Sequence, residues 1–163
     1  MKYKCTEVTI NKIKRSFLEL TNIKPANKIF VKEMMPRAEF AADCRGNICF
    51  GSGYALIPLR KMNELEIRGW SYLLSTEIME YQYRLMSTNL HSGWFRMYKG
   101  HLEKIWLPEI DFEQEELQLI FKAIEQDPSD EFSWERLNCY VARKMAFSEE
   151  ELEYIAKYIE QCH

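Results

Sequence analysis

Apolar residues recur at steps of three and four over residues 64–86, or over the shorter stretch 70–86, which is the spacing of an amphipathic helix. The pattern predicts one long helix with a single apolar stripe that packs into the core. The stripe consists of six residues: Trp70, Leu73, Leu74, Ile78, Tyr81 and Leu85.

The same spacing predicts further helices towards both ends of the chain. The first covers residues 9–20 and has basic side chains between its apolar positions. Two acidic helices cover residues 112–126 and 131–145, with an Asp-Pro-Ser break between them. Ser148 is followed three residues later by Glu151, the arrangement of a capping box, so a last helix is predicted to begin there.

Residues 25–58 show a different pattern, in which short runs of branched and aromatic side chains alternate with turn residues. Short strands with short connections form a small antiparallel or mixed sheet, and we predict one here. Its strands are expected over residues 28–34, 37–42, 48–50 and 54–57, with a turn over residues 44–47.

The long helix is followed by a loop over residues 87–95, a short helix over 99–104 and an extended segment over 105–108. The predicted fold class is α+β, with a small mixed or antiparallel sheet and a long packing helix, followed by a helical C-terminal tail. We expect residues 1–110 to form the α+β domain. Residues 111–163 are expected to form an acidic helical tail that packs on this domain or on a partner domain.

The chain has 163 residues, of which 47% are hydrophobic, so one compact domain with its own core is expected. Its net charge of −3 hides an asymmetry, because residues 1–104 carry 17 basic and 10 acidic residues whereas residues 105–163 carry 5 and 15. The corresponding net charges are +7 and −10. This separation fits an anionic partner on one side of the molecule, although two ordinary solvated faces explain it equally well.

No apolar run is long enough to cross a bilayer, and the N-terminus lacks the apolar core of a signal peptide. We therefore expect a cytoplasmic protein with no membrane partner. No two cysteines form a CxxC pair, which favours free buried thiols over a zinc site. The five cysteines are Cys5, Cys44, Cys49, Cys139 and Cys162.

The sequence contains none of the common catalytic motifs: GxGxxG, GxxxxGK[ST], HExxH and GxSxG are all absent. Its three histidines, at positions 91, 101 and 163, have no metal-ligand spacing and are expected at the surface or in caps. Carboxylates are numerous in the tail, but they recur on exposed helix faces. We expect no catalysis by this chain alone, and no cofactor or metal bound to it.

Residues 89–99 bring amides, a hydroxyl, cations and aromatic rings into one short segment. Arginine and lysine donate to guanine edges or phosphates, and asparagine pairs with adenine through two hydrogen bonds. Serine and backbone N–H groups hold phosphate oxygens. The segment is therefore a candidate for contacting DNA.

Three stretches of the chain together resemble a known family, in their order and their spacing. They are residues 28–43 continued by 52–58, the helix over 71–86 continued through Gly93-Trp94-Phe95-Arg96 to residues 102–108, and residues 140–152. The family is the TaqI-like C-terminal specificity, or target-recognition, domain of type II and IIG adenine-specific DNA methyltransferases and restriction–modification enzymes.

The resemblance implies sequence-specific recognition of double-stranded DNA. The catalysis would belong to a preceding methyltransferase domain that uses S-adenosylmethionine, and this chain would be a fragment or a standalone specificity part. Its cations would contact phosphates or guanine edges, while its polar loop residues would read bases or position the backbone. The expected DNA-binding residues are Lys32, Arg37, Arg45, Asn89, His91, Ser92, Trp94, Arg96 and Lys99.

Each of these roles has an alternative. Trp94, Phe95 and Tyr98 are expected to pack into the core along the return path of the loop, and Arg96 is as readily placed in a salt bridge with an acidic tail residue. Arg37 and Arg45 lie near predicted turns, where simple exposure accounts for them. Two other functions stay open: a protein-interaction module that uses the acidic amphipathic helices, and a hydrolase that uses clustered carboxylates.

Overall fold

The computed structural model describes residues 27–46, 48 and 52–163. The helix predicted over residues 9–20, and all of the strand predicted over 48–50 except residue 48, lie outside this part of the chain. Cys5 and Cys49 lie outside it as well.

Two small antiparallel sheets form the base of the fold. In the first, strand β1 (Lys28–Val31) lies between β3 (Phe40–Asp43) and β4 (Tyr54–Leu56). Ile29 of β1 stands opposite Ala42 and Leu56, so all three strands are in register at its centre. Ile29 and Val31 are buried, as period-two alternation along a strand requires for a sheet with one covered face.

The second sheet contains β2 (Met34–Met35), β6 (Phe95–Arg96) and β5 (Thr88–Asn89), in that order. It joins segments that lie about sixty residues apart in the chain, since Met34 pairs with Arg96 and Met35 with Phe95. The strand predicted over residues 28–34 is therefore two strands, one in each sheet.

The long helix predicted over residues 64–86 is two helices, α2 (Glu64–Leu74) and α3 (Glu77–Met86). The hydroxyls of Ser75 and Thr76 donate to carbonyls of the preceding turn, both at 2.8 Å, and these side-chain bonds compete with continuation of the helix. Ser75 Oγ also accepts the Phe40 N–H of β3 at 3.0 Å, which ties the break to the sheet.

The break changes which residues of the predicted apolar stripe are buried. Leu73, Leu74 and Ile78 are in the core, as predicted. Leu85 is 60% exposed, because the second helix starts in a new orientation and no longer continues the stripe of the first. The predicted burial of Leu85 was wrong.

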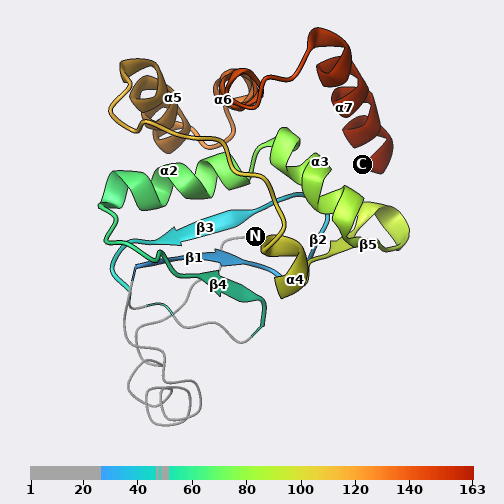
Figure 1. Ribbon diagram of the computed structural model, residues 1–163, viewed down its shortest axis with the longest axis horizontal. Helices are drawn as coiled ribbons and strands as arrows, with labels where there is room; N and C mark the ends of the chain where they lie inside the picture. Colours follow the sequence, from blue (N-terminus) through green and yellow to red (C-terminus); the bar gives the residue numbers. More distant parts are fainter. Residues whose placement is uncertain (1–26, 47, 49–51) are drawn as a thin grey trace.

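The remaining helices are α4 (Lys99–Leu102), α5 (Glu115–Gln126), α6 (Glu131–Lys144) and α7 (Glu149–Cys162). The capping box predicted at the start of the last helix is confirmed, since Ser148 and Glu151 each accept the other's backbone N–H. Figure 1 shows three layers: the sheets, then α2 and α3, then α5, α6 and α7 on the far side.

The middle layer serves two cores. Leu74 and Tyr83 face the core over the sheets, whereas Leu73 and Ile78 belong to the core formed with α5 and α6. A Cβ on Gly69 of α2 would lie 2.5 Å from a carbon of the Phe112 ring, so glycine lets this ring pack closely against the helix. The predicted α+β class is confirmed. No helix of the described residues is both long and apolar enough to cross a membrane.

Candidate functional site

Strands β5 and β6 form a tight hairpin that contains most of the residues predicted to contact DNA. Asn89 pairs with Phe95, and the Leu90 N–H donates to the Trp94 carbonyl at 2.7 Å, which closes a three-residue loop. That loop is a short 3₁₀ turn, η2 (His91–Gly93), none of whose residues is buried. The hairpin therefore exposes its polar tip while Phe95 anchors its base in the core.

The tip has an unusual backbone. Ser92 and Gly93 both have positive φ, at 62° and 74°. A left-handed conformation is uncommon for a residue with a side chain, and a closing glycine in this conformation is typical of three-residue hairpin loops. A Cβ on Gly93 would also overlap the carbonyl oxygen of Cys162, so the C-terminal end of α7 lies directly against the tip.

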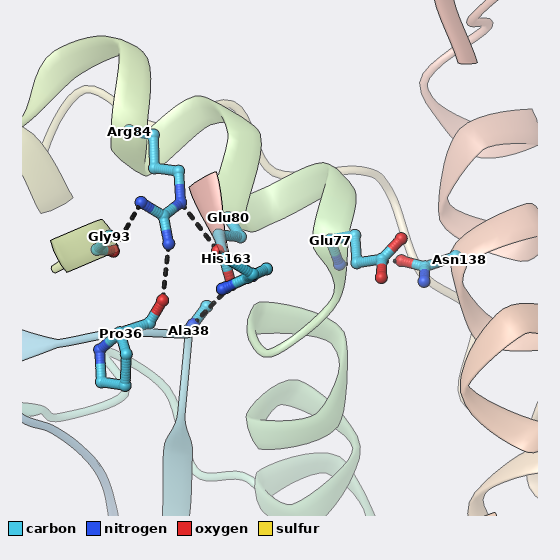
Figure 2. A network of polar contacts seen from close by, with 8 residues as sticks. All are labelled: Pro36, Ala38, Glu77, Glu80, Arg84, Gly93, Asn138 and His163. Carbon is cyan, nitrogen blue, oxygen red and sulfur yellow. Dashed lines mark hydrogen bonds and ion pairs between the residues drawn. The ribbon is translucent and has the colours of Figure 1, made fainter. Parts of the chain in front are cut away.

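A buried arginine fixes the hairpin from beneath (Figure 2). The side chain of Arg84 on α3 is only 1% exposed. Its guanidinium donates to Glu80 at 2.7 Å, to the Gly93 carbonyl at 3.0 Å and to the Pro36 carbonyl at 2.5 Å. It also lies over the Phe95 ring, 4.5 Å from the ring centroid. One side chain thus connects α3, the hairpin and the link from β2 to β3.

Glu80 extends this network in two directions. Its Oε2 accepts the Ala38 N–H at 2.7 Å, and its Oε1 lies 3.2 Å from Nε2 of His163. Burial lowers the pKa of His163 below its usual 6.5, against the opposing charge of Glu80. The network therefore ties the end of α7 to the base of the hairpin. His163 is the exposed C-cap residue of α7, as predicted for a surface or capping histidine, and its imidazole also takes part in this network.

Arg96 leaves the hairpin on β6 and meets Glu33, which lies in the link between β1 and β2. Its Nε donates to Glu33 Oε1 at 2.8 Å, and its Nη2 donates to the same oxygen. The hydrogen bonds that Arg96 donates to Glu33 raise the pKa of Arg96 above its usual value. Tyr98 packs beneath the guanidinium, with 4.9 Å from Cζ to the ring centroid. Of the alternatives for Arg96, the salt bridge forms, but its partner is Glu33 and not an acidic tail residue, because β2 pairs with β6 and brings Glu33 to it.

Two of the three aromatic predictions for the hairpin were also wrong. Phe95 is completely buried, as predicted, but Trp94 is 43% exposed and Tyr98 is 37% exposed. Strand alternation explains the difference, since Phe95 points into the core and its neighbour Trp94 points away from it.

The other predicted DNA-binding residues lie at different distances from the hairpin. Lys32 is next to Glu33 in the chain and pairs with Glu39 at 2.5 Å, and Lys99 begins α4 and pairs with Glu103 at 3.5 Å. Arg37 is exposed in the link between β2 and β3. Arg45 follows the far end of β3, and Figure 1 shows that end on the opposite side of the molecule from β5. Arg37 follows Pro36, whose carbonyl accepts from the same Arg84 guanidinium as the Gly93 carbonyl, so of the nine residues only Arg45 lies on the opposite side of the molecule from the hairpin.

A cleft of about 1070 Å³ lies between α3 and the helices α6 and α7. Arg37 and His163 line it together with Glu77 and Glu80 of α3 and Asn138 of α6. Its surroundings raise the pKa of Glu77, with burial as the largest cause and the charge of Glu80 as the next. Figure 2 shows Glu77 turned towards Asn138, whose side-chain oxygen accepts the Glu77 N–H at 2.9 Å.

The hydrolase alternative requires two carboxylates that converge in a cleft, and Glu77 and Glu80 are the candidate pair in this one. Both oxygens of Glu80 are engaged, one by Arg84 and His163 and the other by the Ala38 N–H. Paired-carboxylate hydrolysis needs two acids that are open to the substrate. The pair formed by Glu77 and Glu80 does not offer this.

The described cysteines are free, as predicted, but none of them is buried: Cys139 is exposed, and Cys44 and Cys162 are half-buried. The predicted burial was wrong for these three. Among the described residues, no group of three or more His, Cys, Asp or Glu side chains is placed to hold a metal ion.

Glu33, Glu80 and Arg84 position the hairpin and were not singled out from the sequence. Glu80 and Arg84 stand four residues apart on one helix, which is the pattern of an ordinary surface ion pair. Only the packing of the hairpin over α3 distinguishes them from such a pair. Comparison of the chain with known protein families finds no match, and comparison with curated proteins finds none either.

Proposed function

We propose that this chain is a sequence-specific DNA-recognition module of a type II restriction–modification system. The observation that carries the proposal is the hairpin: its tip exposes Asn89, His91, Ser92 and Trp94, while Arg84 and Phe95 hold its base rigidly. A rigid element with exposed amide, imidazole and hydroxyl groups suits the reading of base edges in a groove.

The charge distribution supports the same proposal. Ten of the fifteen acidic residues of the tail belong to α5, α6 and α7, which lie on the far side of α2 and α3 from the sheets (Figure 1). Lys32 and Lys99, in contrast, flank the hairpin in the basic part of the chain. Phosphate contacts from such cations give affinity that depends on salt but carries no sequence information.

The family resemblance supplies the partners. Double-stranded DNA is the ligand, and an adenine-N6 methyltransferase domain that binds S-adenosylmethionine is the partner whose reaction this module directs. Residues 1–163 contain no glycine-rich cofactor motif, so in this proposal the chain contributes recognition and no catalysis. The module would act in the cytoplasm.

The second candidate is a protein-interaction module, and three exposed apolar side chains favour it: Leu119, Phe132 and Tyr154 on the tail helices. The apolar faces of these helices are, however, mostly buried within the chain, by residues such as Leu117, Leu137 and Ile155. This leaves isolated exposed residues rather than a continuous face, and the DNA proposal accounts for more of the structure.

A binding assay separates the two candidates. Fluorescence anisotropy of the chain with pooled random duplexes should show binding at low salt that weakens steeply as salt increases. Arg96→Ala should lower the affinity for duplexes that the wild-type chain selects. The absence of binding even at low salt would reject the DNA proposal and favour protein interaction.

A further inference from the structure

The ion pair between Arg96 and Glu33 uses only one edge of the guanidinium. Arg96 Nε and Nη2 both donate to Oε1 of Glu33. Within the described residues, Arg96 Nη1 and Glu33 Oε2 form no hydrogen bond. The pair is also open to solvent, with 41% of the Arg96 side chain and 31% of the Glu33 side chain exposed. One end of the guanidinium and one carboxylate oxygen are thus available side by side.

Both side chains are held in place before any ligand binds. The Met97 N–H donates to the Glu33 carbonyl at 2.7 Å, and Met34 pairs with Arg96, so the two backbones are fixed to each other. The Tyr98 ring supports the flat face of the guanidinium. An arginine oriented in this way loses less conformational freedom on binding than a free surface arginine does.

The charge of the pair indicates which part of DNA it contacts. A phosphate group attracts net positive charge, but the carboxylate of Glu33 neutralises Arg96 and would repel a phosphate. A base edge requires donors and acceptors in a fixed geometry instead. Two N–H groups at the end of a guanidinium match the O6 and N7 acceptors of guanine, and a carboxylate oxygen accepts from the N4 amino group of cytosine.

We propose that Arg96 and Glu33 together read one G·C base pair from the major groove. Arg96 donates to guanine through Nη1 and the remaining N–H of Nη2, and Glu33 Oε2 accepts from the paired cytosine. This assignment rests on the proposed DNA-recognition function and specifies one position of the target. It makes Glu33 both a base-reading residue and the group that orients Arg96.

The test is enrichment of a motif from a random duplex library by the full chain, followed by affinity measurements on the enriched duplex. Wild type should enrich a motif with a fixed G·C pair. Exchanging that pair for A·T should lower wild-type affinity about 5- to 150-fold, the range expected for a good bidentate base contact. Arg96→Lys keeps the charge but lacks the planar fork, so it should weaken the preference at this one position. Glu33→Gln should weaken the same preference.

Arg143→Lys is the matched control, because Arg143 forms a similar exposed pair with Glu116 in the tail, at 2.6 Å. It should leave the whole motif unchanged, and circular dichroism melts should show that all variants fold.

If wild type enriches no motif, the DNA-recognition function itself fails. If wild type enriches a motif that Arg96→Lys retains in full, only the G·C assignment is overturned. Equal weakening on all duplexes by Arg96→Ala, with a flatter salt dependence, would identify a phosphate contact and overturn it as well.

Discussion

Arg84 shows how a single side chain can determine the position of a loop. Almost all of its surface is removed from water, and its donors go to one carboxylate and two backbone carbonyls. A buried ion pair of this kind contributes little net stability compared with an apolar pair, but removing one partner leaves the other charged and unpaired. Removal of either Arg84 or Glu80 is therefore expected to destabilise the position of the hairpin.

We expect Arg84→Met to lower the free energy of unfolding by about 3–5 kcal/mol, because Glu80 is left buried without its guanidinium. Urea denaturation followed by circular dichroism measures this change. The control is Arg143→Ala, which removes an exposed ion pair and should change stability by less than about 1 kcal/mol. Similar losses in the two variants would contradict the structural role of the buried pair.

Gly93 and Gly100 form a matched pair for testing the tip of the hairpin. Gly93→Ala places a Cβ against the Cys162 carbonyl at a φ of 74° and should cost about 1–3 kcal/mol of stability. Gly100 lies in α4 with nothing within 4 Å of the added Cβ, so Gly100→Ala should change stability by at most about +1 kcal/mol. Thermal melts of both variants measure these changes, and equal stability of the two variants would count against the packing of α7 on the tip.

The buried carboxylate of Asp43 should make the stability of the first sheet depend on pH. Burial alone raises the pKa of its carboxyl, but Lys28 at 2.8 Å and the Ile48 and Gly46 N–H groups outweigh it and place the pKa below the usual 3.8. The resulting stability is present above pH 3.8 and is lost as the pH falls through the lower folded-state value.

Asp43→Asn removes this contribution, so the variant should be less stable than wild type at pH 6. The difference should shrink as the pH falls from about 5 to 2, because wild type then loses the same contribution. Urea titrations across this range measure it. A difference that stays constant with pH would show that the carboxylate charge is not what stabilises the sheet.

At the scale of elements, α7 depends on a cap that the sequence already revealed. Ser148 Oγ accepts the Glu151 N–H, and the Glu151 carboxylate accepts the Ser148 N–H at 2.8 Å. We expect Ser148→Ala to cost about 1 kcal/mol, the usual loss for an N-cap serine. Chemical denaturation tests it, and Ser148→Asp, which preserves the capping acceptor, should retain most of the stability.

The helices and the fold class could be predicted because they depend on local patterns, namely apolar spacing, an Asp-Pro break and a capping box. The interruption at Ser75 and Thr76 could not, since serine and threonine also occur inside helices. The hydroxyl bonds that favour the break are supported here by the bond to Phe40 of β3, which the local sequence does not reveal. The same limit applies to Leu85, whose exposure follows from the orientation of α3 after the break.

The candidate site was predicted in part for a similar reason. Its exposed tip was contained in one segment, residues 89–99, whose composition indicates binding. Its supports come from Glu33, Glu80 and His163, which are far apart in the chain. Only the pairing of β2 with β6 and the packing of α7 on α3 bring them together. Long-range contacts of this kind have no signature in a single sequence.

At the scale of the whole molecule, the acidic tail and the rest of the chain share a core. Leu73 and Ile78 of the middle layer pack with Leu117, Leu137 and Val141 of the tail helices. The boundary at residue 110 that the sequence suggests stays a prediction, but it divides one of the two cores. We infer that the tail supports the fold of the part that carries the hairpin.

A fragment of residues 1–110 should therefore lack cooperative unfolding, because its middle layer would expose the apolar side chains that the tail covers. Thermal melts and the dispersion of amide resonances, compared with those of the full chain, test this expectation. A fragment that melts in one sharp transition would show that the tail is a separate unit.

The two fixed points of the hairpin have a consequence for engineering. Gly93 and Phe95 are held by Arg84, by the end of α7 and by the core, whereas Asn89, His91, Ser92 and Trp94 face solvent. Framework and variable positions are thus separated within seven residues, as they are in an antibody loop on its scaffold. A library that randomises only the four solvent-facing positions should yield folded members with new target preferences.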